Sequence, residues 1–142
     1  MRIVIGSDHA GFHLKQTVAD HLRAAGHDIE DVGPQNTESV DYPDFAKQVA
    51  GGVAGGSADC GVLVCGTGQG MAMTANKVAG VRASVVSDVF SARGTRAHNN
   101  ANVLCLGERV VGAGLALEIV DAWMGTEFEG GRHARRVSKI EG

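Results

Sequence analysis

The sequence predicts an α/β fold in which helices cover both faces of a parallel sheet and form one three-layer domain. Along the 142 residues, apolar runs of strand length alternate with segments whose apolar residues recur at helical spacing. Strand–helix–strand repeats of this kind build parallel sheets with a helix layer on each face. Hydrophobic residues make up 44% of the chain and aromatic residues only 4%, which indicates a core of aliphatic side chains.

The first half of the chain carries three expected strands and two helices. Residues 2–7 form an apolar run typical of a buried strand. Leu14, Val18 and Leu22 then recur at helical spacing, which places Lys15 on the opposite, solvent-facing side of that helix. The remaining elements of this half are a strand at 28–33, a helix that follows Asp41 and ends before Gly55, and a strand at 60–65.

The second half predicts strands at 82–86 and 103–107 and helices at 71–77, 89–97, 115–124 and 132–140. The last helix is basic and amphipathic. Arg132 and Arg136 share one face, suited to binding a phosphate, while Val137 and Ile140 lie on a face suited to docking on protein. Arg109 is a further candidate phosphate ligand, unless it pairs with the neighbouring Glu108.

Bulk properties exclude several classes of protein. A net charge of −3 gives no general attraction to nucleic acid or to an anionic membrane. No apolar run approaches the roughly 20 residues of a membrane helix, and the apolar start of the chain is too short for a signal peptide. Three cysteines without a C-x-x-C pair suit a reducing compartment. We therefore expect a cytoplasmic protein with neither a nucleic-acid nor a membrane partner.

The strongest functional signal is a cysteine at the end of a strand, Cys65, followed by the glycine-rich segment 66–70. Ligands of such folds bind at the carboxyl ends of the strands. Exposed N–H groups of a glycine turn bind anions, and the same field lowers a thiol pKa from about 8.5 toward neutrality. The alternative is a structural cysteine beside a tight turn. Cys60 and Cys105 have no such loop and are expected to be structural.

Three known phosphate-binding motifs come close to this loop and fail. A tyrosine-phosphatase loop requires arginine where the chain has Met71, and the Gly-Lys-Ser/Thr of a Walker A loop is absent. The dinucleotide motif G-x-G-x-x-G is replaced by G-x-G-x-G. Asp88 nevertheless lies where a ribose-binding acid would follow. A nucleotide- or flavin-binding module therefore stays open as a second hypothesis.

Two further polar clusters are candidates for the site. Asp8 and His9 follow the first strand, so they should lie beside the Cys65 loop. His98 and Asn99 instead precede the fifth strand, which places them at the opposite edge of the sheet in their own subunit. Neither cluster has the ligand spacing of a metal site, so we expect no metal.

Taken together, these segments resemble the ribose/galactose isomerase family, which includes type B ribose-5-phosphate isomerases and galactose-6-phosphate isomerase subunits. The resemblance spans nearly the whole chain and rests on several independent motifs in the family's order. The matching segments are residues 6–11, 41–43, 65–71, 75–77, 98–103 and 129–133.

The resemblance implies a Rossmann-like five-stranded parallel sheet and a homodimer, sometimes paired into tetramers, with each active site built from two subunits. The C-terminal residues 131–142 would then contact a neighbouring subunit. Cys65 matches the family's catalytic base, His98 its ring-opening acid, and Thr67 a residue that assists the reacting oxygens. The positions expected to hold substrate are Asp8, His9, Tyr42, Gly66, Thr67, Gly68, Gln69, Gly70, Asn99, Arg109, Arg132 and Arg136.

The implied reaction is the interconversion of ribose 5-phosphate and ribulose 5-phosphate through an enediolate, without metal or organic cofactor. One branch of the family uses a glutamate just past the glycine loop as the base. Residues 66–77 contain no carboxylate, so this role falls to Cys65. The sequence leaves the sugar open: allose 6-phosphate, galactose 6-phosphate and a tetrose phosphate are alternatives.

Overall fold

The computed structural model describes residues 1–142 and contains five strands and six helices. In chain order these are β1 (Arg2–Ser7), α1 (Phe12–Ala24), β2 (Asp28–Asp31), α2 (Tyr42–Ala54), β3 (Cys60–Cys65), α3 (Gln69–Ala75), β4 (Ala83–Val85), α4 (Val89–Ala97), β5 (Val103–Gly107), α5 (Ala113–Met124) and α6 (Arg132–Glu141). All strand pairs are parallel, and the strand order is β2-β1-β3-β5-β4. The predicted α/β class and five-stranded parallel sheet are confirmed.

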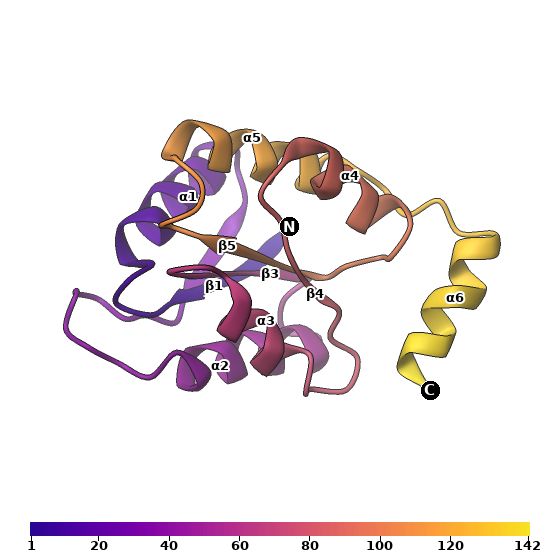
Figure 1. Cartoon of the computed structure of the whole chain (residues 1–142), viewed down its shortest axis with the longest axis horizontal. Helices are drawn as coiled ribbons and strands as arrows, with labels where there is room; N and C mark the ends of the chain where they lie inside the picture. The colour runs from indigo at the N-terminus through magenta and orange to yellow at the C-terminus, as the bar shows by residue number, and fades with distance from the viewer.

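The sheet lies between two helix layers, with α1, α4 and α5 on one face and α2 and α3 on the other (Figure 1). Side chains of a strand alternate between the faces, so β3 contributes to both cores. Val62 and Val64 pack in the core that includes Trp123 of α5, whereas Leu63 and Cys65 pack in the core of α2 and α3. Cys65 is therefore positioned at the end of a strand that is buried along its whole length. No helix is both long and apolar enough to cross a membrane.

Helix α6 lies at one side of this sandwich rather than in either layer (Figure 1). Only Val137 of this helix is buried, and Ile140 is 62% exposed. Within the chain, the face on which Val137 and Ile140 were expected to dock is thus used by Val137 alone. Ile140 remains available to a neighbouring molecule.

The strand order brings two loops together that are distant in the sequence. β5 lies between β3 and β4, and Cys65 is level with Gly107 in the parallel ladder. The segment after β5 therefore borders the glycine turn after β3, and the amide of Glu108 donates to the carbonyl of Cys65 at 2.9 Å. Arg109 is placed at the candidate site by this neighbourhood.

The expected exposure of Lys15 is wrong, since its side chain is completely buried. The ammonium group lies 2.8 Å from both carboxylate oxygens of Asp31 and donates to the carbonyl of Pro34 at 2.8 Å. Helical spacing marked this position as polar and outward, but β2 ends beneath it and supplies a carboxylate. The ion pair ties α1 to the start of the 34–41 loop that leads to Tyr42.

Replacing Lys15 with methionine should lower the free energy of unfolding by about 3–5 kcal/mol, because removal of one partner leaves a buried carboxylate unpaired. Asp31 is only 12% exposed in its side chain, so water cannot replace the ammonium fully. Urea denaturation at fixed protein concentration measures the change, with exposed Lys47→Met as the matched control. Equal stabilities of the two variants would contradict the structural role of the pair.

Candidate active site

The sulfur of Cys65 faces the glycine turn, as the sequence predicts. The backbone N–H of Gly68 donates a hydrogen bond to Cys65 Sγ with an N···S distance of 3.1 Å. The residue is only 5% exposed, and its sulfur ends the strand where the chain turns into α3. A hydrogen bond from an amide stabilises a thiolate more than a thiol, because the charged sulfur is the stronger acceptor.

The turn itself requires glycine at several positions. Gly68 has a φ of +81°, a conformation that L-residues rarely adopt. A Cβ atom on Gly70 would lie 2.6 Å from ring carbons of Tyr42, so the tyrosine ring packs directly on the turn. Two of the turn amides expected to bind an anion already have partners, because the amide of Gly68 donates to the sulfur and that of Gln69 donates to the hydroxyl of Thr67 at 3.3 Å.

Asp8 and His9 lie next to this turn, at the end of the neighbouring strand. The amide of Asp8 donates to the carbonyl of Val64 at 3.2 Å, one residue before the cysteine. Asp8 is 8% exposed, and its carboxylate accepts the amide of Gly11 at 3.0 Å, which fixes the loop that enters α1. His9 Nδ1 accepts the amide of Val40 at 3.2 Å. An open hollow of ≈ 440 Å³ is lined by Asp8, His9, Val40, Asp41, Tyr42, Pro43 and Asp44.

Arg109 completes the cationic side of this edge. Its amide donates to the carbonyl of Gly66 at 3.1 Å, and a Cβ on Gly66 would lie 3.5 Å from Arg109 Cδ and Nη1. The guanidinium thus lies over the glycine turn. Pairing with Glu108, the alternative that the sequence left open, does not occur: the Glu108 carboxylate accepts the amide of Leu14 at 2.6 Å. Arg109 is free to bind an anion.

The other two cysteines differ from Cys65 in their surroundings. Burial raises the pKa of Cys60 to about 11, and burial raises the pKa of Cys105 still further. Both thiols lie in the apolar cores and are free of disulfides. Because the thiolate is the reactive form, neither is suited to proton transfer near neutral pH.

The remaining predicted site residues lie at the other edge of the sheet. β5 begins at Val103, level with Gly61 at the start of β3, while Cys65 is level with Gly107 at its end. His98 ends α4 just before this strand and Asn99 follows it, so one strand length, about 15 Å, separates them from the sulfur of their own chain. Arg132 and Arg136 are exposed on α6, on the same side.

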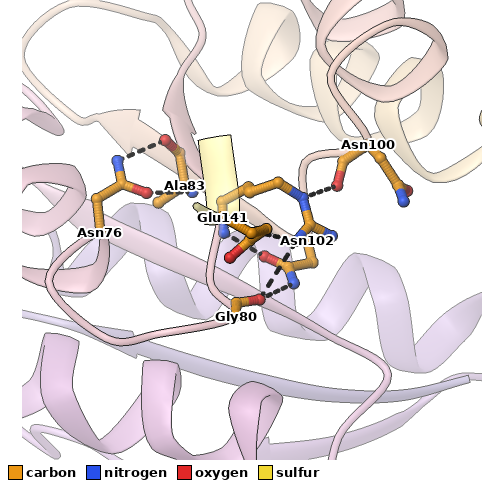
Figure 2. A network of polar contacts seen from close by, with 7 residues as sticks. Asn76, Gly80, Ala83, Asn100, Asn102 and Glu141 are labelled. Carbon is orange, nitrogen blue, oxygen red and sulfur yellow. Dashed lines mark hydrogen bonds and ion pairs between the residues drawn. The ribbon is translucent and has the colours of Figure 1, made fainter. Parts of the chain in front are cut away.

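A polar network fixes the loop that follows His98 (Figure 2). Arg82 Nε donates to the carbonyl of Asn100 at 2.9 Å, and the guanidinium forms an ion pair with Glu141 at the end of α6. The side chain of Asn102 accepts the amide of Arg82 at 2.7 Å and donates to the carbonyl of Gly80 at 2.9 Å. The network joins the His98 loop, the edge strand β4 and α6 into one unit.

His98 also has two partners that the sequence analysis missed. Its ring stacks on that of His133, with centroids 4.4 Å apart and planes 13° from parallel. The Nε2 atoms of His98 and His133 each lie 3.8 Å from a different carboxylate oxygen of Glu129. Glu129 and His133 are four residues apart, a carboxylate–histidine spacing visible in the sequence. Their proximity to His98 was not, because it depends on how the 125–131 segment folds back.

Comparison with known proteins agrees with this arrangement. The profile of the family described as Ribose/Galactose Isomerase matches residues 3–140. The chain is 51% identical to ribose-5-phosphate isomerase B of Escherichia coli (strain K12) over 139 residues, which cover 98% of this chain and 93% of that protein. The chain belongs to the ribose/galactose isomerase family.

Solved structures of family members have the same fold. Ribose-5-phosphate isomerase B of Clostridium thermocellum superposes with a TM-score of 0.98 at 54% identity, covering 99% of this chain and 95% of that one. The enzyme of Mycoplasma genitalium with bound ribulose-5-phosphate superposes with a TM-score of 0.96 at 46% identity, covering 99% and 93% of the two chains.

The nucleotide-binding hypothesis rested on Asp88, and the structure gives this acid a different role. The Asp88 carboxylate accepts the amide of Ser91 at 2.6 Å and caps α4. This hydrogen bond to the backbone of Ser91 lowers the pKa of Asp88. The acid therefore has a structural task at the start of a helix, and the hypothesis loses its main support.

Proposed function

We propose that the protein is an aldose–ketose isomerase that interconverts ribose 5-phosphate and ribulose 5-phosphate. The observation that carries the proposal is the sulfur of Cys65, held by the Gly68 amide at the carboxyl edge of the sheet in a chain of this family. The Mycoplasma genitalium relative, similar over nearly the whole chain, binds ribulose-5-phosphate. Isomerisation of a sugar phosphate next to its carbonyl requires a base and an oxyanion site, and this edge supplies candidates for both.

In this proposal Cys65 is the base. The thiolate removes the proton from C2 of the open-chain aldose, the electrons move into the carbonyl, and an enediolate forms. The Thr67 hydroxyl donates a hydrogen bond to its oxygens, together with those amides of the glycine turn that are not already directed at Cys65 Sγ or Thr67 Oγ1. A proton then moves from the oxygen on C2 to the oxygen on C1, the Cys65 thiol returns its proton to C1, and the ketose forms. A positioned base commonly contributes a factor of about 10²–10⁴ to the rate.

The phosphate and the ring-opening group would come from both edges of the sheet, and hence from two subunits. His98 and Asn99 are about 15 Å from the Cys65 sulfur in one chain, whereas a second copy can present them to it. Arg132 and Arg136 project from α6, which is exposed except at Val137 and suited to reach a neighbouring molecule. We infer a homodimer with two shared sites. His9 and Arg109 would complete the phosphate grip.

The same site geometry accommodates the same chemistry on related sugars, so the physiological substrate is a separate question. Allose 6-phosphate, galactose 6-phosphate and a tetrose phosphate differ from ribose 5-phosphate in the distance between the phosphate and C2. Comparison of kcat/KM across these aldose phosphates decides between them. The phosphate grip should favour one chain length, because Arg109 and the sulfur of Cys65 are both tied to the glycine turn by backbone hydrogen bonds.

Thiol alkylation tests the proposal directly. Treatment with iodoacetamide should abolish conversion of ribose 5-phosphate in step with a single adduct at Cys65, mapped by mass spectrometry. Cys60 and Cys105 should stay unmodified, because burial raises both of their pKa values. Saturating ribulose 5-phosphate should slow both the modification and the inactivation. Full activity of a protein quantitatively alkylated at Cys65 would contradict the proposal.

A further inference from the structure

A carboxylate–diimidazole cluster lies at the edge of the sheet opposite the Cys65 loop. It consists of His98, Glu129 and His133, which come from the end of α4, the segment before α6 and the first turn of α6. The Glu129 amide donates to the carbonyl of Ala97 at 3.0 Å, next to His98. The contact anchors the carboxylate to the element that carries the imidazole.

The backbone between Glu129 and His133 is shaped to bring the two together. Gly130 and Gly131 both have positive φ values, +69° and +59°, which L-residues rarely adopt. The chain reverses there, and the amide of His133 donates to the carbonyl of Gly130 at 3.1 Å. His133 is thereby pressed onto the ring of His98 and is only 12% exposed, while His98 is 52% exposed and can reach a ligand.

The geometry of the cluster does not suit a metal ion. Its three ligand atoms lie within 4.8 Å of one another, whereas nitrogen ligands on one zinc ion are about 3.3 Å apart. A bound metal must also lie close to the plane of each imidazole. The two rings are stacked at 13° from parallel, so their planes meet only far outside the cluster. The cluster is better suited to holding a proton and its charge.

We propose that Glu129 and His133 form a clamp that positions His98 for opening the furanose ring of the substrate, an inference that rests on the proposed isomerase function. The carboxylate lies equally far from both imidazoles, 3.8 Å from each Nε2. It attracts the imidazolium form of His98 and draws its Nε2 toward Glu129, while His133 fixes the plane of the ring by stacking. Glu129 is thus a positioning residue, and only His98 touches the sugar.

The charges around the cluster support this division of roles. Burial, and next the positive charge of His98, lowers the pKa of His133, and Arg132 and Arg136 on α6 act in the same direction. Glu129 opposes them. The lowered pKa of His133 disfavours a second positive charge in the cluster, so the carboxylate serves His98.

The ring-opening step balances without a co-reactant. The imidazolium of His98 gives its proton to the ring oxygen as the bond between that oxygen and C1 breaks. The C1 hydroxyl loses its proton to water, and its electrons form the carbonyl. The imidazole then regains a proton from water. The positive charge appears and disappears on His98 alone, beside the carboxylate that stabilises it.

Deuterium at C2 of ribose 5-phosphate separates ring opening from the chemistry at C2, because only removal of the C2 proton breaks a bond to that atom. Ribose 5-phosphate closes into a furanose and must be opened, whereas ribulose 5-phosphate has its 5-hydroxyl blocked by phosphate and stays open. Glu129→Gln should reduce kcat/KM for ribose 5-phosphate about tenfold or more. The primary isotope effect on kcat/KM should be smaller in this variant than in the unaltered protein, because ring opening then limits the rate. The value of kcat/KM for ribulose 5-phosphate falls by the same factor, since the equilibrium constant fixes the ratio of the two.

Glu127→Gln is the matched control, since Glu127 is an exposed acid two residues away without an ion pair. It should behave as the unaltered protein in both directions. No loss of kcat/KM in Glu129→Gln, or a loss with an undiminished isotope effect, would overturn the clamp. ¹⁵N NMR of the histidine rings adds a readout independent of activity: the signals of His98 and His133 should shift in Glu129→Gln and not in Glu127→Gln. If the unaltered protein isomerises neither sugar, the proposed function fails while the NMR result still tests the clamp.

Discussion

Replacing Cys65 with alanine should lower the rate of ribose 5-phosphate isomerisation by a factor of about 10²–10⁴ or more, because the variant has no base at C2. No other group is placed to substitute. Residues 66–77 contain no carboxylate, and the Asp8 carboxylate is held by the amide of Gly11. The loss should appear in kcat for both directions, since the same proton is removed from C2 in one and from C1 in the other.

The variant should fold normally, which makes the loss interpretable. Cys65 is small, and alanine removes only its sulfur from the core of α2 and α3. Ribulose 5-phosphate binding, measured by calorimetry, should persist, because the phosphate grip does not involve the thiol. Cys60→Ala is the matched control: it removes an equally buried thiol from the other core and should keep near-full activity. A Cys65→Ala protein that retains a tenth of the original rate would refute the assignment.

Much of the fold could be predicted because its elements have strong local signals. The bounds of β1, β3, β5 and α4 agree with the sequence prediction, since buried parallel strands read as continuous apolar runs between turn residues. β2 ends at Asp31 rather than Gly33, and β4 spans only Ala83–Val85. Both are edge strands with partial burial, so their apolar pattern is weak where pairing stops. The positions of β4 and β5 within the sheet could not be predicted, since the spacing of apolar residues does not show which strands pair.

The candidate site divides in the same way. The residues at the carboxyl edge follow strand ends, and a parallel sheet brings all such ends together, so the proximity of Asp8 to the Cys65 turn was predictable. The partners of buried charges were not. Lys15 is paired by the end of β2 and Glu129 by the fold of a loop, and both contacts join segments that the linear pattern treats separately. Similarly, Glu108 was a candidate partner of Arg109 until the structure placed its carboxylate at the start of α1.

Two inactive variants should restore activity to one another when they share a dimer. Cys65→Ala and His98→Asn should each be nearly inactive as homodimers. A hybrid dimer with one copy of each variant has one site that carries both changes and one site that carries neither. Purified hybrids, made by co-expression with two different tags, should therefore show about half of the original activity. Assay of ribose 5-phosphate conversion measures the recovery.

This outcome depends on the geometry of the sheet rather than on either residue alone. If the base and the ring-opening group belonged to one chain, every site of the hybrid would contain one defect, and no activity would return. His98 and Cys65 lie at opposite ends of β5 and β3, and the β3–β5 register leaves no freedom to bring them together within a subunit. A hybrid of Cys65→Ala with His9→Ala is the control, since both residues lie at the carboxyl edge of the same chain. Each site of this control hybrid carries one defect, so its activity should not exceed the mean of the two parent homodimers. If the control hybrid recovered as much activity as the first hybrid, the shared site would be contradicted.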